Sequence, residues 1–170
     1  STSGASTQTA CAAGTYQAST AQSSCDDADA GYFVSATAAT SQTACATGTY
    51  QASTGQTSCD DAAAGYYSEG TVTDATTGVT TVATSQTPCA AGKYQADTAQ
   101  SSCDTASAGY YSPGTVGAST VDSSVTTAAT SQIPCAAGTY QASTGESSCD
   151  DAAAGYYSTG TTIVNGVVTF

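Results

Sequence analysis

The segment CAAGTYQASTAQSSC, residues 11–25, decides the fold of this chain because it recurs three more times. The later copies read CATGTYQASTGQTSC at 45–59, CAAGKYQADTAQSSC at 89–103 and CAAGTYQASTGESSC at 135–149. The two cysteines lie 14 positions apart in every copy, and a Gly-Tyr-aromatic tripeptide follows each copy. Four copies with one internal spacing predict a tandem array of small modules.

The spacers between these segments divide the chain into four repeats. We place the repeats at residues 1–40, 41–84, 85–130 and 131–170, the last with a C-terminal hairpin or donor strand. Eight cysteines allow 105 pairings, but the constant spacing favours one local bond in each repeat, which closes a 15-residue loop worth about 3 kcal/mol. The predicted pairs are Cys11–Cys25, Cys45–Cys59, Cys89–Cys103 and Cys135–Cys149. Zinc is the competing use of these thiols, but it favours closely spaced ligands and histidine. The chain offers neither, so we expect no metal site.

The composition excludes a single broad hydrophobic core. Alanine, serine and threonine number 34, 24 and 33 of the 170 residues, and Leu, Met, Trp, His and Arg are absent. Burying a large apolar side chain contributes at most about 2 kcal/mol, whereas ordering each backbone residue costs about 1–2 kcal/mol. The 25 residues that are Tyr, Phe, Val or Ile cannot offset that cost. We therefore predict a small disulfide-rich β fold, an elongated rod of four cysteine-loop modules with β-hairpin inserts.

The charge excludes several partners. Thirteen acidic residues oppose only Lys93, which gives a net charge of −12. Nucleic acid and anionic membrane surfaces are therefore excluded, and no apolar stretch is long enough to span a bilayer. An even number of cysteines without histidine predicts an oxidising, extracellular setting, either as a secreted protein or as a cell-surface appendage.

Three inserts in the spacers predict β-hairpins, and the first repeat lacks one. Residues 70–84 and 114–130 alternate valine and threonine around turn residues. In residues 161–170, two β-branched apolar runs flank Asn165-Gly166, which is a preferred type I′ hairpin turn.

The two ends of the chain complement each other. If the end of one copy is joined to the start of another, the interval from Cys149 to Cys11 is 32 residues, the same as from Cys103 to Cys135. A start at Ser1 without a leader fits a processed chain or an excerpt. This match predicts either one period of a longer array or a head-to-tail homopolymer; the alternative is a fragment cut at an arbitrary site. In the homopolymer, residues 161–170 are predicted to pair with the next copy by strand addition. The predicted polymerisation residues are Ile163, Val164, Asn165, Gly166, Val167, Val168 and Phe170.

An aromatic pair follows each cysteine loop. We expect these pairs to pack on the next repeat, as neighbouring units do in solenoids. The predicted inter-repeat residues are Tyr32, Phe33, Tyr66, Tyr67, Tyr110, Tyr111, Tyr156 and Tyr157. Between the second cysteine and each pair, an Asp start, small residues and a Gly stop would suit one helical turn.

These loops with their GYYS tails resemble the ephrin-receptor-like extracellular cysteine-rich repeats, which are related in style to tumour necrosis factor receptor modules. Similar repeats occur in protist surface antigens and mastigoneme-type filament proteins. Members of that class usually carry a second disulfide in each repeat. Its two positions hold other residues here: Ala28, Ala62, Ala106 and Ala152 on one side, and Gln8, Gln42, Gln86 and Gln132 on the other. The resemblance implies an elongated extracellular module.

The inventory of side chains argues against an enzyme. There is no histidine to act as a base, and the cysteines are assigned to bridges, so we expect no catalytic residue and no cofactor. The adjacent aspartates Asp26-Asp27, Asp60-Asp61 and Asp150-Asp151 are interpreted as solvated turns rather than glycosidase carboxylates. Weak calcium binding is a less favoured alternative because calcium needs six or more oxygens.

The predicted function is therefore structural: an extracellular protein that assembles head to tail into a filament. Its abundant serine and threonine favour O-linked glycans, with plain polar filler as the alternative and an ice-binding surface as a weaker one. The competing function is a monomeric cell-surface coat antigen or a receptor-like binding module.

Overall fold

The structure of the chain is a computed structural model that describes residues 7–115, 128–160, 162–164 and 167–169. The described residues form short β-strands and no helix, and four disulfides lie in tandem along the chain. The predicted class, a tandem array of small disulfide-rich β modules, is confirmed. The chain divides into two compact units: Ser1–Asp60 with Glu69–Ser85, and Asp61–Ser68 with Gln86–Phe170. The four predicted repeat boundaries remain a prediction.

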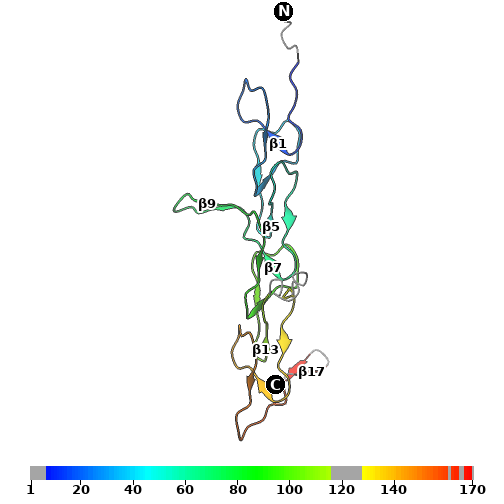
Figure 1. Ribbon diagram of the computed structural model, residues 1–170, viewed down its shortest axis with the longest axis vertical. Helices are drawn as coiled ribbons and strands as arrows, with labels where there is room; N and C mark the ends of the chain where they lie inside the picture. The colour runs from blue at the N-terminus through cyan, green and yellow to red at the C-terminus, as the bar shows by residue number, and fades with distance from the viewer. Residues whose placement is uncertain (1–6, 116–127, 161, 165–166, 170) are drawn as a thin grey trace, which may run out of the picture. The chain divides into compact units, whose positions relative to one another are not determined.

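Each cysteine loop carries a small antiparallel sheet (Figure 1). In the first loop, β1 (Thr15–Tyr16) pairs with β2 (Asp26–Asp27). The same pairing joins β11 (Lys93–Tyr94) to β12 (Asp104–Thr105) and β15 (Thr139–Tyr140) to β16 (Asp150–Asp151). The strands β5 (Thr49–Tyr50) and β6 (Asp60–Asp61) hold the equivalent sequence positions in the second repeat. The local disulfide scheme is confirmed in all four loops: Cys11–Cys25, Cys45–Cys59, Cys89–Cys103 and Cys135–Cys149.

The helical turn suggested for the Asp-Ala run is wrong. Asp26 and Asp27 lie in a strand, and the backbone N–H of Ala28 donates to the carbonyl oxygen of Gly14 at 2.9 Å. A lone helical turn fixes several residues for one hydrogen bond. The Cys11–Cys25 bond instead holds these aspartates beside β1, whose backbone supplies hydrogen-bond partners. The strand is therefore favoured over the helical turn.

A second set of sheets joins each of the first three aromatic pairs to the residues just before the next cysteine loop. The strand β3 (Tyr32–Phe33) of the first repeat pairs antiparallel with β4 (Thr43–Ala44), which lies just before the second loop. The later equivalents are β7 (Tyr66–Tyr67) with β10 (Thr87–Pro88), and β13 (Tyr110–Tyr111) with β14 (Ile133–Pro134). The spacer can vary in length because only its last two residues enter this sheet.

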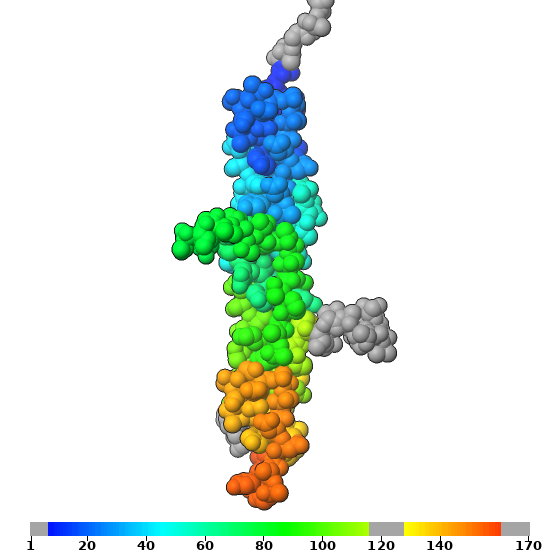
Figure 2. Space-filling view, turned by 60° about the vertical axis from the view of Figure 1, so that its left-hand side comes forward, coloured from blue at the N-terminus to red at the C-terminus, as the bar shows by residue number. Residues whose placement is uncertain are grey.

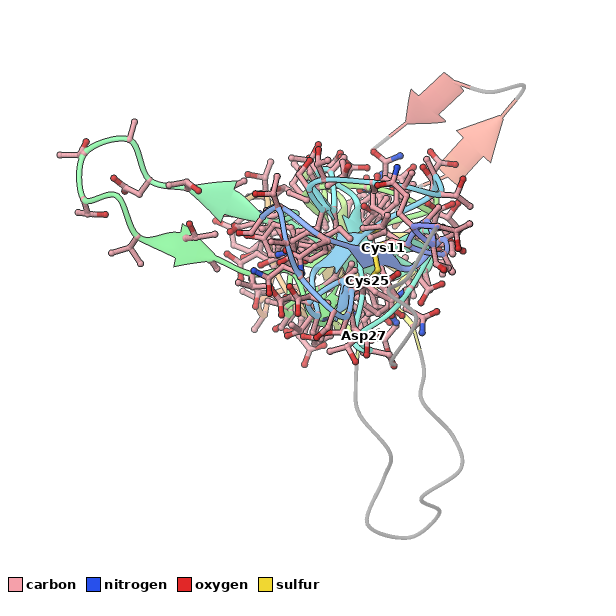
Figure 3. The ribbon with its side chains drawn as sticks, turned by 90° about the horizontal axis from the view of Figure 1, so that it is seen from above. Cys11, Cys25 and Asp27 are labelled. Carbon is pink, nitrogen blue, oxygen red and sulfur yellow. A yellow bond between two sulfur atoms is a disulfide. The ribbon has the colours of Figure 1, made fainter. Side chains whose placement is uncertain are left out.

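The inserts form hairpins where they are described. β8 (Val72–Thr73) pairs with β9 (Thr80–Thr81), which confirms the hairpin predicted within 70–84. It projects from the first unit in both Figure 1 and Figure 3. β17 (Thr162–Val164) pairs with β18 (Val167–Thr169), which confirms the C-terminal hairpin. The turn Asn165-Gly166 and residues 116–127 of the other insert lie outside the described residues.

The interior of the described residues consists mainly of small residues and glutamine, with Val34 and Tyr110 as larger apolar side chains. Ala28, Ala62 and Ala106 are fully buried, and Cys45 and Cys89 are each 1% exposed. The buried polar residues include Gln51, Gln95 and Gln141. Small side chains let backbones approach each other closely, so backbone hydrogen bonds replace most of the apolar packing that the composition lacks.

Candidate functional site

The junctions between successive repeats are the candidate functional site, because each uses the same backbone hydrogen bonds. At the first junction, the N–H of Gly31 donates to the carbonyl oxygen of Gln51 at 2.7 Å, and that of Val34 donates to Gln56 at 3.0 Å. The second and third junctions repeat both bonds at the same lengths: Gly65 to Gln95, Ser68 to Gln100, Gly109 to Gln141 and Ser112 to Glu146. In each case the segment after one loop donates to the next loop.

Two further bonds run in the opposite direction. The N–H of Gly55 donates to the carbonyl oxygen of Ala28 at 2.8 Å, and the N–H of Cys45 donates to Gly31 at 2.9 Å. Their equivalents at the later junctions are Ala99 to Ala62, Cys89 to Gly65, Gly145 to Ala106 and Cys135 to Gly109. Donors and acceptors on both sides therefore join one repeat to the next in a fixed register.

A glutamine side chain closes each junction from outside. The Oε1 of Gln42 accepts from the backbone N–H of Asp29 at 2.7 Å, while its Nε2 donates to the Asp29 carboxylate at 2.8 Å. The Oε1 atoms of the two later counterparts accept in the same way: Gln86 from Ala63 at 2.6 Å, and Gln132 from Ser107 at 2.7 Å. No local sequence pattern indicated this role for the three glutamines.

A threonine holds the base of the described insert. The N–H of Thr71 donates to the carbonyl oxygen of Cys45 at 2.8 Å, and its Oγ1 donates to that of Gly31 at 2.8 Å. The same Oγ1 accepts from the N–H of Ala83 at 3.0 Å, where the chain returns from the hairpin. The carbonyl oxygen of Ala83 then accepts from Gln51 at 2.9 Å.

Thr115 and Ala129 repeat this arrangement in the second unit. The Thr115 hydroxyl donates to the carbonyl oxygen of Gly65 at 2.6 Å and accepts from the N–H of Ala129 at 3.0 Å. In the first repeat, the adjacent residues Ala38 and Ala39 make the corresponding backbone bonds to Cys11 and Gln17. In both described cases the threonine hydroxyl bonds the preceding repeat and the residue at which the chain returns from the insert.

The junctions bring two glycine backbones into contact. A Cβ atom added to Gly14 would overlap the carbonyl oxygen of Gly55, and one added to Gly92 would overlap that of Gly145. At Gly138, the equivalent residue of the fourth loop, an added Cβ would meet nothing within 4 Å. The fourth loop thus has the same shape but an open surface.

Exposure of the aromatic pairs shows the same contrast. Tyr110 in the third repeat is 7% exposed, whereas Tyr156 and Tyr157 in the fourth are 80% and 88% exposed. A hollow of about 620 Å³ lies beside these two exposed tyrosines. Its lining includes Tyr140, Ala152, Ala153, Tyr156, Tyr157 and Ser158. Figure 2 shows the fourth repeat in orange.

The structure places the other predicted residues as follows. The first three aromatic pairs lie in β3, β7 and β13, each paired with the approach to the next loop; packing between their rings remains a prediction. Of the predicted polymerisation residues, those in β17 and β18 pair with one another inside the chain. Asn165, Gly166 and Phe170 lie outside the described residues. Pairing of this hairpin with a second copy stays a prediction.

The aspartate pairs lie on the surface. Figure 3 shows Asp27 at the edge of its repeat and the Cys11–Cys25 bond inside it. Within the described part of the chain, no three Cys, Asp or Glu side chains gather as metal ligands would. The carboxyl of Asp74 has a lowered pKa because the backbone N–H groups of Thr77 and Thr76 donate to it at 2.8 and 2.7 Å.

Two comparisons with known proteins find no match. The chain matches no protein-family model and no curated protein sequence. Nor do the described residues contain a helix with the length and apolarity that crossing a membrane requires. The four disulfides are typical of proteins that mature in oxidising, extracellular compartments.

Proposed function

We propose that this chain is a structural extracellular protein that assembles with itself, head to tail, into a filament. One observation carries the proposal: the three junctions use one set of backbone bonds in one register. A junction that works between neighbouring repeats of one chain also suits two chains, because its chemistry does not require covalent continuity. A heterologous contact of this kind leaves a free surface at each end and builds an open polymer when the rotation between copies does not close a ring.

The surface chemistry supports an extracellular coat on such a filament. The strands of the β8–β9 hairpin are exposed and rich in threonine, and the net charge of −12 keeps separate filaments apart. We propose O-linked glycans on these serine- and threonine-rich surfaces, and no catalytic role for the chain.

Electron microscopy of the concentrated, oxidised protein tests the proposal. We expect unbranched filaments with a fixed axial repeat, and the same images from protein freed of its glycans. Salt should favour them, because it screens the repulsion between acidic copies. A single monomeric species at every protein and salt concentration would contradict the filament and favour the coat antigen or binding module.

The C-terminal hairpin provides a separate test of the mechanism predicted from the sequence. If residues 161–170 join copies by strand addition, their deletion should leave monomers that keep all four disulfides. Filaments that persist after the deletion would remove strand addition and leave the proposed filament standing.

A further inference from the structure

We infer that the exposed surface of the fourth repeat binds the first cysteine loop, residues 11–25, of a second copy of this chain. This surface, here called the open face, consists of Gly138, Ala152, Gly155, Tyr157 and Ser158. The inference rests on the proposed function and specifies the two surfaces that meet. Its occupant is identified by what covers the same surface on the three earlier repeats, which is in each case the next cysteine loop.

The open face is a repeat surface from which the usual cover is missing. Its position equivalent to Ala28, Ala62 and Ala106 is Ala152, which is partly exposed whereas the others are fully buried. Gly155 is exposed, while its counterparts Gly31, Gly65 and Gly109 are buried. The fourth loop itself is otherwise normal, because the N–H of Gly138 still donates to the carbonyl oxygen of Ser158 at 2.8 Å. The surface is therefore formed but uncovered.

The first loop already has the conformation of the later loops, each of which bonds the tail of the repeat before it. Ala21 has a φ of 60°, close to the 58° of Ala99, which occupies the same position in the covered third loop. The side chain of Gln17 accepts from the N–H of Ser19 at 2.9 Å and donates to the carbonyl oxygen of Ser24 at 3.1 Å. Gln51 makes both bonds in the covered second loop, at 3.0 Å each. A preorganised loop loses little conformational freedom on binding.

The equivalence of the loops fixes the bonds between copies. The N–H groups of Gly155 and Ser158 donate to the carbonyl oxygens of Gln17 and Gln22 of the second copy. In return, the N–H groups of Ala21 and Cys11 of the second copy donate to Ala152 and Gly155. The carbonyl oxygen of the second copy's Ala21 then lies over Gly138, in the space that Gly55 and Gly145 fill over Gly14 and Gly92.

The glycines supply a test with a matched control. In Gly138→Ala, the new methyl group meets nothing in the isolated chain but occupies the place of the incoming carbonyl. In Gly78→Ala, which lies in the β8–β9 hairpin, the methyl group also meets nothing. Both glycines have positive φ, at 86° and 69°, so both variants carry a similar backbone strain. Only the first should affect association.

Sedimentation velocity over a range of concentrations measures the effect. We expect Gly138→Ala to weaken association roughly 10- to 100-fold, the cost of overpacking a fitted contact, and Gly78→Ala to assemble like the natural chain. Hydrogen exchange on the unaltered protein gives a second reading that needs no variant. The amides of Gly155 and Ser158 should become protected as concentration rises, while those of Gly109 and Ser112 stay protected throughout.

The outcomes separate the two proposals. Filaments from Gly138→Ala at natural affinity, with Gly155 and Ser158 still exchanging freely, overturn the open face and leave the filament standing. Small closed oligomers that protect Gly155 and Ser158 support the open face and overturn the filament. A natural chain that stays monomeric at all concentrations overturns both.

Discussion

The third and fourth repeats carry the same tail, GYYS, but the tail differs between them in secondary structure and in exposure. In the third repeat, Tyr110–Tyr111 form strand β13, and Tyr110 is 7% exposed. In the fourth, Tyr156 and Tyr157 form no strand and are 80% and 88% exposed. Identical residues therefore acquire structure only when a following loop supplies partners, as expected of a chain stabilised by nearest-neighbour interfaces.

The largest effect should come from removing the disulfide of the third loop. Cys89→Ser with Cys103→Ser should lower the free energy of unfolding by about 3 kcal/mol, because a closed loop of this length restricts the unfolded chain. The third loop is covered on both sides, so hydrogen exchange should rise in the second and fourth repeats as well. The same pair of changes at Cys135 and Cys149 should disturb mainly the fourth repeat. If both pairs of cysteine changes raised hydrogen exchange in equally many repeats, stability would not depend on the neighbouring repeats.

The next effect concerns the tyrosines directly. Tyr110→Ala should destabilise the second unit by about 2 kcal/mol, since a large buried side chain is lost. Tyr156→Ala should change stability by less than about 0.5 kcal/mol, as exposed positions usually do. Denaturant unfolding at low protein concentration, where copies do not associate, makes the comparison. Similar losses from the two changes would mean that the exposure of the fourth tail does not hold in solution.

A smaller effect is expected from the glutamine that closes the junction between these two repeats. Gln132→Ala removes the acceptor of the Ser107 N–H and should cost about 1 kcal/mol, the usual net worth of such a hydrogen bond. Gln8, the exposed glutamine at the same place before the first loop, serves as the control. Thermal unfolding of Gln132→Ala and Gln8→Ala should show a lower midpoint for the first only.

The smallest effect lies outside the junctions and tests whether they are independent of the inserts. The folded-state pKa of Asp74 is lowered by the Thr77 and Thr76 N–H groups, so its contribution is complete above the ordinary aspartate pKa and disappears as pH falls through the lowered value. Acid should therefore loosen the β8–β9 turn. NMR shifts of the Thr76 and Thr77 amides should follow this titration, and Asp74→Asn should abolish it. If the amide shifts of Gly31 or Gln51 followed the same titration, the β8–β9 turn and the junction would be coupled.

The sequence predicted the features that depend on nearby residues. The disulfides follow from a constant spacing, and the C-terminal hairpin follows from β-branched runs around Asn165-Gly166. The suggested helical turn at Asp26-Asp27 failed because its evidence was also local, whereas the competing strand partner in β1 is brought close by the Cys11–Cys25 bond.

The junctions could not be derived in the same way. The partners Gly31 and Gln51 are 20 positions apart, while Gly65 and Gln95 are 30 apart, so no fixed interval marks the bond. Backbone atoms also carry no residue-specific signal. The glutamine that closes each junction differs from an ordinary surface glutamine only by its three-dimensional partner. The repetition predicts that neighbouring repeats contact each other, but only the three-dimensional structure identifies the atoms that join them.

The threonines at the base of two inserts, Thr71 and Thr115, have a consequence for how this chain can be extended. Thr71 and Ala83 mark the exit and return of a whole hairpin, yet Ala38 and Ala39 make the equivalent backbone bonds while adjacent in sequence. The backbone bonds of a repeat therefore form both with and without a segment inserted between these two positions. A foreign peptide introduced between Ala38 and Ala39, with threonine in place of Ala38, would be displayed at the surface without altering how the loops stack.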